Sequence, residues 1–162
     1  MGNPYDDLAV EYDRFYSTAE YLRENQQVFD AIAQLYPKGG AVLDLGWGTG
    51  LALDYLDVPP SLYLGIDLSE GMLAQARKKY PGHYFAKSDM ALVVDHPALI
   101  ISTFGSFSYC TSGAVTAKHI RDSGAAFFIM AFGADHPGCA LFRARGVRSP
   151  TIWRYSPSQM AH

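Results

Sequence analysis

The stretch "VLDLGWGTG", Val42 to Gly50, joins an apolar strand pattern to a loop with glycine at every second position. An aspartate, Asp44, stands just before the first glycine, and Trp47 stands between the first two. Glycines in such a loop let the backbone adopt positive φ and come close to a ligand. The stretch therefore predicts a ligand-binding turn at the carboxyl end of a strand.

The chain as a whole has the size and composition of one folded domain. Of its 162 residues, 49% are hydrophobic and 18% are charged, so we expect a single domain over 1–162. A net charge of -3 supplies no basic stripe for phosphates. Nucleic acid is therefore not an expected partner, whereas a small-molecule substrate is. The first residues carry neither a basic region nor an apolar run, which predicts a cytoplasmic protein without a membrane anchor.

Apolar runs and helical spacings alternate along the sequence. Helices are predicted over 19–35, 51–58, 70–79 and 114–121, and strands over 42–45, 61–69, 83–89, 98–104 and 125–132. The apolar stripe of the first helix is predicted to consist of Leu22, Val28, Phe29, Ile32 and Leu35. This alternation predicts an α/β fold, a Rossmann-like three-layer sandwich with a mostly parallel sheet of about five strands. Within this domain, we expect leading helices over 1–38, the core over 39–133 and an irregular segment over 134–162.

Two aspartates at strand ends indicate what the glycine loop binds. A dinucleotide fingerprint, G-x-G-x-x-G, would need a small residue in place of Leu51, so a nicotinamide or flavin cofactor is not favoured. Asp44 would repel a diphosphate and suits a ligand with a cationic group. Asp67, at the end of the second strand, can accept both hydroxyls of a ribose. The sequence therefore predicts a pocket that takes a ribose and tolerates a cation.

Four motifs, taken in order, resemble those of class I S-adenosylmethionine-dependent methyltransferases. They are "VLDLGWGTG", "YLGIDLSEGMLAQARKKYP", "AKSDMA" and "LIISTFGSFSY". The resemblance covers about Tyr5 to Phe132 and includes the leading segment "YDDLAVEYDRFY". It implies S-adenosyl-L-methionine as the cofactor and methyl transfer to a small-molecule oxygen or nitrogen.

Carried over position by position, the resemblance also implies a set of cofactor-binding residues. Asp44 and the backbone from Gly46 to Gly50 would hold the amino acid end, and Asp67 the ribose. Other residues would flank the adenine, bind its exocyclic amine, line the methyl side or close the pocket from above. The complete set is Tyr12, Tyr16, Asp44, Gly46, Trp47, Gly48, Gly50, Asp67, Leu68, Met72, Asp89, Met90, Thr103 and Phe104.

Each of these assignments competes with a purely structural one. Asp44 could cap a loop amide, Asp89 could cap the residues that follow it, Met72 could belong to the core, and Tyr12 could simply pack. The five histidines show no metal-ligand spacing, so no metal site is predicted. Catalytic residues stay unassigned, because in-line placement supplies most of the rate of methyl transfer and needs no visible base.

The sequence departs from the family pattern in two places. Trp47 stands where the family has a small residue, so its indole either fills part of the pocket or points away and packs against the leading helix. The chain also stops where the family sheet continues, so the usual C-terminal strand pair is expected to be missing. The strand over 125–132 would then be an open apolar edge. We expect residues 134–162 to cover it, or an oligomer or a protein partner to form there.

Two rival functions fit the same pocket. One is an enzyme that cleaves S-adenosylmethionine without an acceptor. The other is a non-catalytic module that binds S-adenosylmethionine or S-adenosylhomocysteine. Turnover of the cofactor alone would identify the first, and tight binding without turnover the second.

Overall fold

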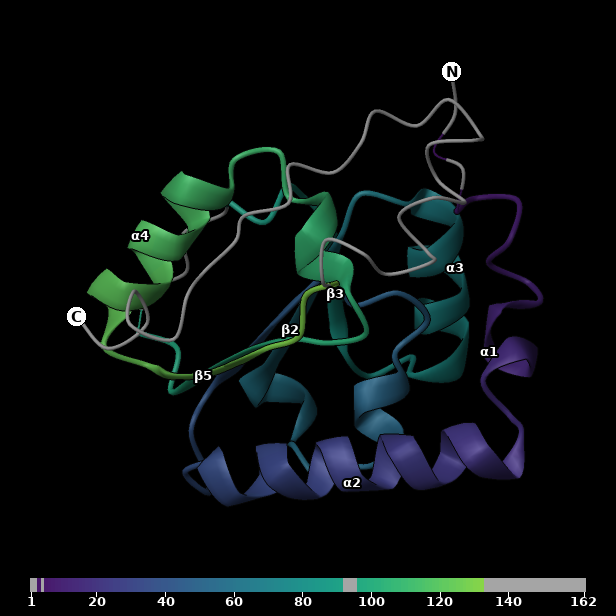
Figure 1. Cartoon of the computed structure of the whole chain (residues 1–162), viewed down its shortest axis with the longest axis horizontal. Helices are drawn as coiled ribbons and strands as arrows, with labels where there is room; N and C mark the ends of the chain where they lie inside the picture. The colour runs from purple at the N-terminus through teal and green to yellow at the C-terminus, as the bar shows by residue number, and fades with distance from the viewer. Residues whose placement is uncertain (1–2, 4, 92–95, 133–162) are drawn as a thin grey trace.

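The protein forms one parallel sheet with helices on both sides (Figure 1). The computed structural model describes residues 3, 5–91 and 96–132. Its strands are β1 (Val42–Leu45), β2 (Tyr63–Asp67), β3 (Tyr84–Lys87), β4 (Leu99–Ser102) and β5 (Ala126–Ile129). They lie in the order β3-β2-β1-β4-β5, and every neighbouring pair is parallel. The predicted α/β fold with about five parallel strands is confirmed. The segment 134–162 lies outside the described residues.

Helices and short 3-10 turns precede β1 and connect β1 to β2, β2 to β3 and β4 to β5. The described helices are α1 (Tyr12–Phe15), α2 (Ala19–Leu35), α3 (Glu70–Lys79) and α4 (Gly113–Ser123), and the 3-10 turns are η1 (Leu51–Asp54), η2 (Pro60–Leu62) and η3 (Ser106–Tyr109). Both α2 and α3 have the predicted bounds. Their first residues are preceded by caps, Thr18 and Ser69, whose side chains accept backbone N–H groups of the first turn.

The buried face of α2 differs from the predicted apolar stripe. Its buried residues are Asn25, Phe29 and Ile32. Leu22 and Leu35, which were expected on that stripe, are 48% and 43% exposed. Buried residues three or four positions apart lie on one helix face. On α2 this face contains Asn25 in place of the expected Leu22 and Leu35.

Apolar side chains form one cluster on each face of the sheet. On the first face, Phe29 and Ile32 of α2 and Leu73 of α3 pack against side chains that include Val42. On the opposite face, Ile120 of α4 packs with residues of η3, β1, β2 and β4, including Phe107, Leu43, Leu45, Ile66 and Ile100. Alternate residues of a strand point to opposite faces, so Asp44 shares the first face with Val42.

Two local predictions are wrong. The segment over 51–58 was expected to be a helix, yet only η1 forms, because the chain must turn extended before Pro59 and Pro60. The leading segment before α2 was expected to be helical, but its one described helix, α1, has only four residues, 12–15. The rest of the leading segment is held by side-chain contacts instead.

The strand order reverses beside β1. The chain passes from β1 outward to β2 and β3, and then returns to β4 on the other side of β1. Ligands of open α/β sheets bind outside the carboxyl ends of the strands at such a reversal. The glycine loop follows β1 at this point. Within the described residues, no helix is long and apolar enough to cross a membrane.

Candidate functional site

The glycine loop turns sharply and leaves one open position. Gly46, Gly48 and Gly50 all have positive φ, at 74°, 62° and 96°. A Cβ atom on Gly46 would lie 2.5 Å from Cβ of Ser106, and one on Gly50 would lie 2.6 Å from the ring of Tyr80. Around Gly48 nothing lies within 4 Å of that position. The backbone at Gly48 is therefore the part of the loop that a ligand can approach.

Asp67 lies at the carboxyl end of β2 and faces this open position. Its Oδ2 accepts the N–H of Gly48 at 2.8 Å, and its Oδ1 accepts the N–H of Ser69 at 2.8 Å. Burial raises the pKa of Asp67, although the backbone donors at Ser69, Gly48 and Leu68 act in the opposite direction. Each carboxylate oxygen still has a lone pair for another donor, so the side chain is both fixed and able to bind.

Asp44 lies in the interior, under the loop. It is 2% exposed, and its Oδ2 accepts the hydroxyl of Tyr63 at 2.6 Å. Its Oδ1 is buried and has no hydrogen-bond partner in the part of the chain that the structure describes. Burial raises the pKa of Asp44 to about 7, and the neighbouring Asp67 carboxylate contributes to the rise. The idea that Asp44 is an exposed loop cap is therefore wrong, whereas its contact with a cofactor stays a prediction.

Trp47 points away from the open side of the loop and into the core. Its side chain is 5% exposed and makes ring contacts with Tyr63, Tyr80 and Phe85 at centroid distances of 4.8, 6.3 and 4.6 Å. Of the two alternatives for Trp47, the one in which the indole points away from the pocket is confirmed. Its ring partners come from β2, β3 and the end of α3, and it shares a buried cluster with Phe29 and Ile32 of α2. Only the backbone of Trp47 remains a candidate contact for a ligand.

The other predicted contacts lie around the same edge with different exposures. Leu68 is 51% exposed, whereas Met72 is 2% exposed and belongs with the buried side chains. Oδ1 of Asp89 accepts the N–H of Ala91 at 2.7 Å and the hydroxyl of Ser112 at 2.9 Å. A Cβ atom on Gly46 would lie 2.6 Å from the methyl carbon of Met90, which places that side chain against the loop. Whether these residues contact a cofactor stays a prediction.

Aromatic rings connect the turn after β4 to the leading segment. Phe104, which directly follows Thr103, has a φ of 50° and lies 6.4 Å from the ring of Tyr16. Tyr16 in turn lies 5.0 Å from Tyr12. Burial raises the pKa of Tyr12, with further contributions from Tyr16, Tyr5 and the Asp67 carboxylate. Tyr12 thus lies close enough to Tyr16 and to the Asp67 carboxylate to be affected by both.

Two acidic residues that sequence reasoning missed fasten the leading segment. Oδ1 of Asp6 accepts the hydroxyl of Ser69 at 2.6 Å and the N–H of Gly71 at 2.9 Å, at the start of α3. Asp13 accepts the hydroxyl of Thr49 in the glycine loop and forms an ion pair with Lys79 at 3.0 Å. Neither contact has a local sequence signal, since each joins residues that are far apart in the chain.

No metal centre is evident in the described part of the chain. Among residues 3, 5–91 and 96–132, no three His, Cys, Asp or Glu side chains gather in a way that could hold a metal ion. The candidate site consists of a glycine loop, two strand-end carboxylates and a set of tyrosines.

Curated relatives match the chain over its central region. An N,N-dimethyltransferase from Streptomyces venezuelae, which acts on dTDP-3-amino-3,4,6-trideoxy-alpha-D-glucopyranose, is 33% identical over 86 residues, which is 52% of this chain and 36% of that protein. A trans-aconitate 2-methyltransferase from Acidovorax sp. (strain JS42) is 37% identical over 82 residues, 49% of this chain and 30% of that protein. The matched region is thus about a third of the length of these relatives.

A solved structure shares the fold. It is S-adenosylmethionine-bound CalS10, an amino pentose methyltransferase from Micromonospora echinaspora, with a TM-score of 0.59 and 20% identity over 82% of this chain and 59% of that one. The sequence model of the family described as "Methyltransferase domain" matches residues 42–127. This range contains the glycine loop, Asp67 and β4, the elements that carry the resemblance to class I S-adenosylmethionine-dependent methyltransferases. Because the match spans more than half of the sequence, the chain belongs to the methyltransferase-domain family.

Proposed function

We propose that this chain binds S-adenosyl-L-methionine, and that the protein to which it belongs transfers the methyl group to an oxygen or nitrogen atom of a small molecule. The observation that carries the proposal is the Asp67 carboxylate, held by the N–H of Gly48 beside the one open position of the glycine loop. The family membership supports it. The named relatives act on an amino sugar and on trans-aconitate, so a small-molecule acceptor is the class proposed.

The residues at the loop suit this cofactor chemically. Asp67 has acceptor capacity left for the two ribose hydroxyls. Asp44 has a buried oxygen without a described partner, which suits a ligand that carries cationic groups. The indole of Trp47 does not obstruct the open side, because it lies in the core. When bound, S-adenosyl-L-methionine supplies a methyl group that its sulfonium has already activated.

The protein's own contribution would then be binding and positioning. The leading segment, fastened by Asp6 and Asp13, lies beside the glycine loop and α3. Its tyrosines contribute apolar, half-buried surface that would exclude water from the reacting atoms. Placement of a nucleophile in line with an activated methyl group supplies much of the rate of such a reaction. A strong general base is not required of the described residues.

Calorimetric titration with S-adenosylmethionine, S-adenosylhomocysteine and NAD tests the proposal. We expect micromolar binding of the first two ligands and none of NAD. Asp67→Asn should weaken binding at least about tenfold, since it removes a charge-assisted contact. Asp57→Asn, an exposed acid between η1 and β2, is the matched control and should bind like wild type. Binding of NAD in preference to the other two would contradict the proposal.

Mass spectrometry of the cofactor after incubation separates transfer from the alternatives. Cofactor that is cleaved in the absence of any acceptor would indicate a cleaving enzyme. Tight binding with an intact cofactor, in the presence of every acceptor tried, would indicate a binding module. Methylated acceptor together with S-adenosylhomocysteine is the expected result.

A further inference from the structure

The buried face of α2 carries a polar side chain that the fold does not use. Asn25 is 1% exposed, and neither its Oδ1 nor its Nδ2 has a hydrogen-bond partner among the described residues. Nearly all buried polar groups in folded proteins are paired, because an unpaired one loses its hydration without compensation. An amide whose oxygen and nitrogen both lack a partner therefore needs an explanation. One explanation is a ligand that forms hydrogen bonds with both atoms.

Asn25 lies one turn before Phe29, whose ring lies 6.0 Å from that of Phe104 at the carboxyl end of β4. α2 leads through residues 36–41 into the start of β1, so its last turns lie at the amino end of the sheet. Ile32 accordingly packs in the cluster that contains Val42, the first residue of β1. Asn25 is two turns earlier, about 10 Å along the helix axis from Ile32 and away from the end of α2 that leads into β1.

A chain of aromatic rings surrounds the same part of α2. Tyr21 lies 5.2 Å from Tyr16, Tyr16 lies 6.4 Å from Phe104, and Phe104 lies 6.0 Å from Phe29. The chain begins and ends on α2, one turn before and one turn after Asn25, with Tyr21 41% exposed and Phe29 1% exposed. We call Tyr16, Tyr21, Phe29 and Phe104 the aromatic enclosure. Phe104 directly follows β4, at the place where the strand order reverses.

We propose that the amide of Asn25 is the hydrogen-bonding contact for the methyl acceptor, and that this acceptor is a small amine rather than a carboxylate. The inference rests on the proposed function and names its substrate class. The amide oxygen accepts an amine N–H, which leaves the nitrogen lone pair for the methyl group. The amide N–H donates to a neighbouring hydroxyl or ether oxygen of the same molecule.

The surrounding charges favour an amine. Within the aromatic enclosure, Phe29 is stacked on Tyr55 at 4.8 Å. Tyr16, Tyr21 and Phe104 are the rings left to attract an amine or a cation and to repel an anion. The Asp67 carboxylate acts on the nearby Tyr12. Lys79, on the other side of Asp13, is occupied by ion pairs with Asp13 and Asp54 at 3.0 and 3.1 Å.

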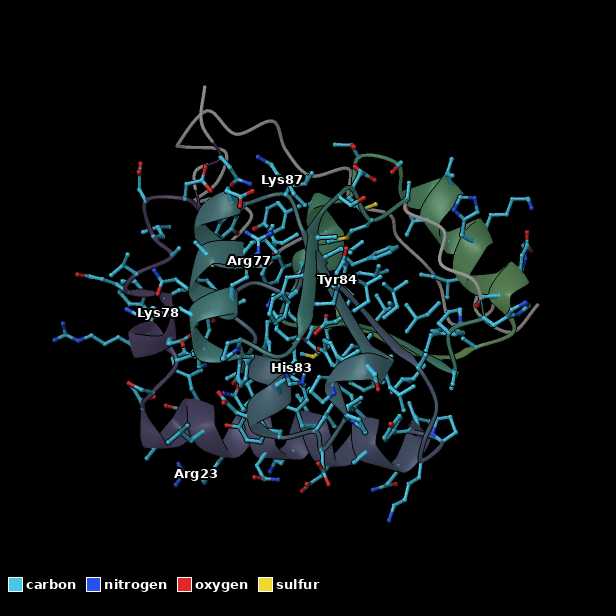
Figure 2. The ribbon with its side chains drawn as sticks, turned by 180° about the vertical axis from the view of Figure 1, so that it is seen from behind. Arg23, Arg77, Lys78, His83, Tyr84 and Lys87 are labelled. Atoms are coloured by element: carbon cyan, nitrogen blue, oxygen red, sulfur yellow. The ribbon has the colours of Figure 1, made fainter. Side chains whose placement is uncertain are left out.

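The cationic side chains nearest to Asn25 in the sequence are not placed to pair with a carboxylate either. Arg14 and Arg23 are both exposed. Arg23 points away from the sheet on the outer side of α2 (Figure 2). A carboxylate acceptor would therefore meet oxygen and aromatic faces, without a described cation to pair with it.

The transfer balances without any further reactant. The amine nitrogen forms the new bond to the methyl carbon with its lone pair, and the carbon–sulfur bond breaks with its electrons left on sulfur. The N–H proton then leaves to solvent. The contribution of Asn25 is to orient the nitrogen, so it is a contact residue for the acceptor.

Asn25→Leu tests the assignment, with Gln27→Leu on the exposed side of α2 as the matched control. Each full chain is assayed with S-adenosylmethionine and three probes: glucosamine, ethanolamine and trans-aconitate. In Asn25→Leu an apolar group of similar size replaces an unpaired amide, so we expect Tm to rise by about 2–4 °C. We also expect cofactor affinity to stay within about twofold, while methylation of the amine falls at least about tenfold. Gln27→Leu should match wild type in all three.

Several results would overturn the inference. A lower Tm for Asn25→Leu would mean that the amide is a structural group with partners of its own. Unchanged amine methylation, methylation of trans-aconitate in preference to both amines, or methylation of neither amine would each refute the substrate class. Failure of wild type to bind S-adenosylmethionine at all would refute the proposed function itself, and the inference with it, at the titration step that precedes the acceptor assay.

Discussion

The indole of Trp47 lies directly against Gly65, the β2 residue that pairs with Asp44 across the sheet. A Cβ atom on residue 65 would lie 2.6 Å from Cδ2 of the indole, closer than real atoms approach. The large residue in the glycine loop and the missing side chain on β2 thus complement each other. The loop keeps a tryptophan because a neighbouring strand makes room for it.

This complementarity predicts strong coupling between the two positions. Gly65→Ala should destabilise the protein by about 1–3 kcal/mol, because the extra carbon overpacks the core. Trp47→Ala should cost about 3–5 kcal/mol through the cavity it leaves. In the Trp47→Ala background, Gly65→Ala should cost nothing or stabilise slightly. Urea unfolding of the four proteins measures the coupling, and additive effects would contradict the packing described here.

Trp47 also gives a prediction about cofactor affinity. Since the indole lies in the core and not over Gly48, Trp47→Cys should leave the affinity for S-adenosylmethionine within a fewfold of wild type, although it lowers stability. Calorimetry at a temperature where both proteins are folded makes the comparison. A many-fold gain in affinity would show that the indole occupies cofactor space.

The buried carboxyl of Asp44 predicts a pH dependence of stability. Its pKa is raised by burial from 3.8 to about 7 in the folded protein. The folded state therefore holds a proton that the unfolded state releases, and the stabilisation present below pH 4 is lost as the pH rises through 7. A shift of this size corresponds to about 4 kcal/mol. Asp44→Asn, which cannot ionise, should be more stable than wild type at pH 8 by about 2–4 kcal/mol.

The measurement is the difference in unfolding free energy between Asp44→Asn and wild type, taken at pH 5, 6, 7 and 8. The difference should grow in favour of the variant across this range. Asp57→Asn, at an exposed acid, should show no such trend. A difference that does not change with pH would mean that Asp44 has an ordinary pKa in the folded protein.

The contact of Asp13 with Thr49 and Lys79 predicts a kinetic effect on the cofactor. Asp13→Ala removes the two contacts that tie the leading segment to Thr49 and Lys79. It also leaves the hydroxyl of Thr49, which is 2% exposed, without its acceptor. We expect a loss of about 1–2 kcal/mol in stability and faster dissociation of S-adenosylmethionine. Stopped-flow displacement measures the rate. Asp7→Ala, at an exposed acid of the same segment, is the control, and equal rates for both variants would count against a closing role.

The contact between Gly71 and Asp6 predicts that Gly71→Ala destabilises the protein, although alanine has the higher helix propensity. In an exposed first turn, Gly→Ala normally stabilises a helix by up to about 1 kcal/mol. Here a Cβ atom would lie 2.7 Å from both Cα and the carbonyl oxygen of Asp6, and backbone atoms cannot give way cheaply. Gly71→Ala should therefore destabilise the protein and make the leading segment more accessible to protease. At Gly82 the nearest atom would be 3.8 Å away, so Gly82→Ala should change stability by less than about 0.5 kcal/mol.

Sequence reasoning was most successful where local patterns decide structure. The bounds of α2 and α3 follow from capping residues and helical spacing, and the strands follow from short apolar runs. Helical spacing was a poor guide over 51–58, where only η1 forms before Pro59 and Pro60. The burial of Asn25 was not predicted, because a polar residue inside an amphipathic helix usually indicates an exposed position.

By itself, the sequence determined the alternation of strands and helices, the glycine loop and the carboxylate at the end of β2. These depend on neighbours within a few residues, so their physical causes lie within the local chain. Only the tertiary structure decided where Trp47 points, which acids fasten the leading segment, and that the amide of Asn25 is buried without a partner. Each of these depends on surfaces brought together from distant parts of the chain, and burial changes the free energy of a polar group far more than its sequence context does.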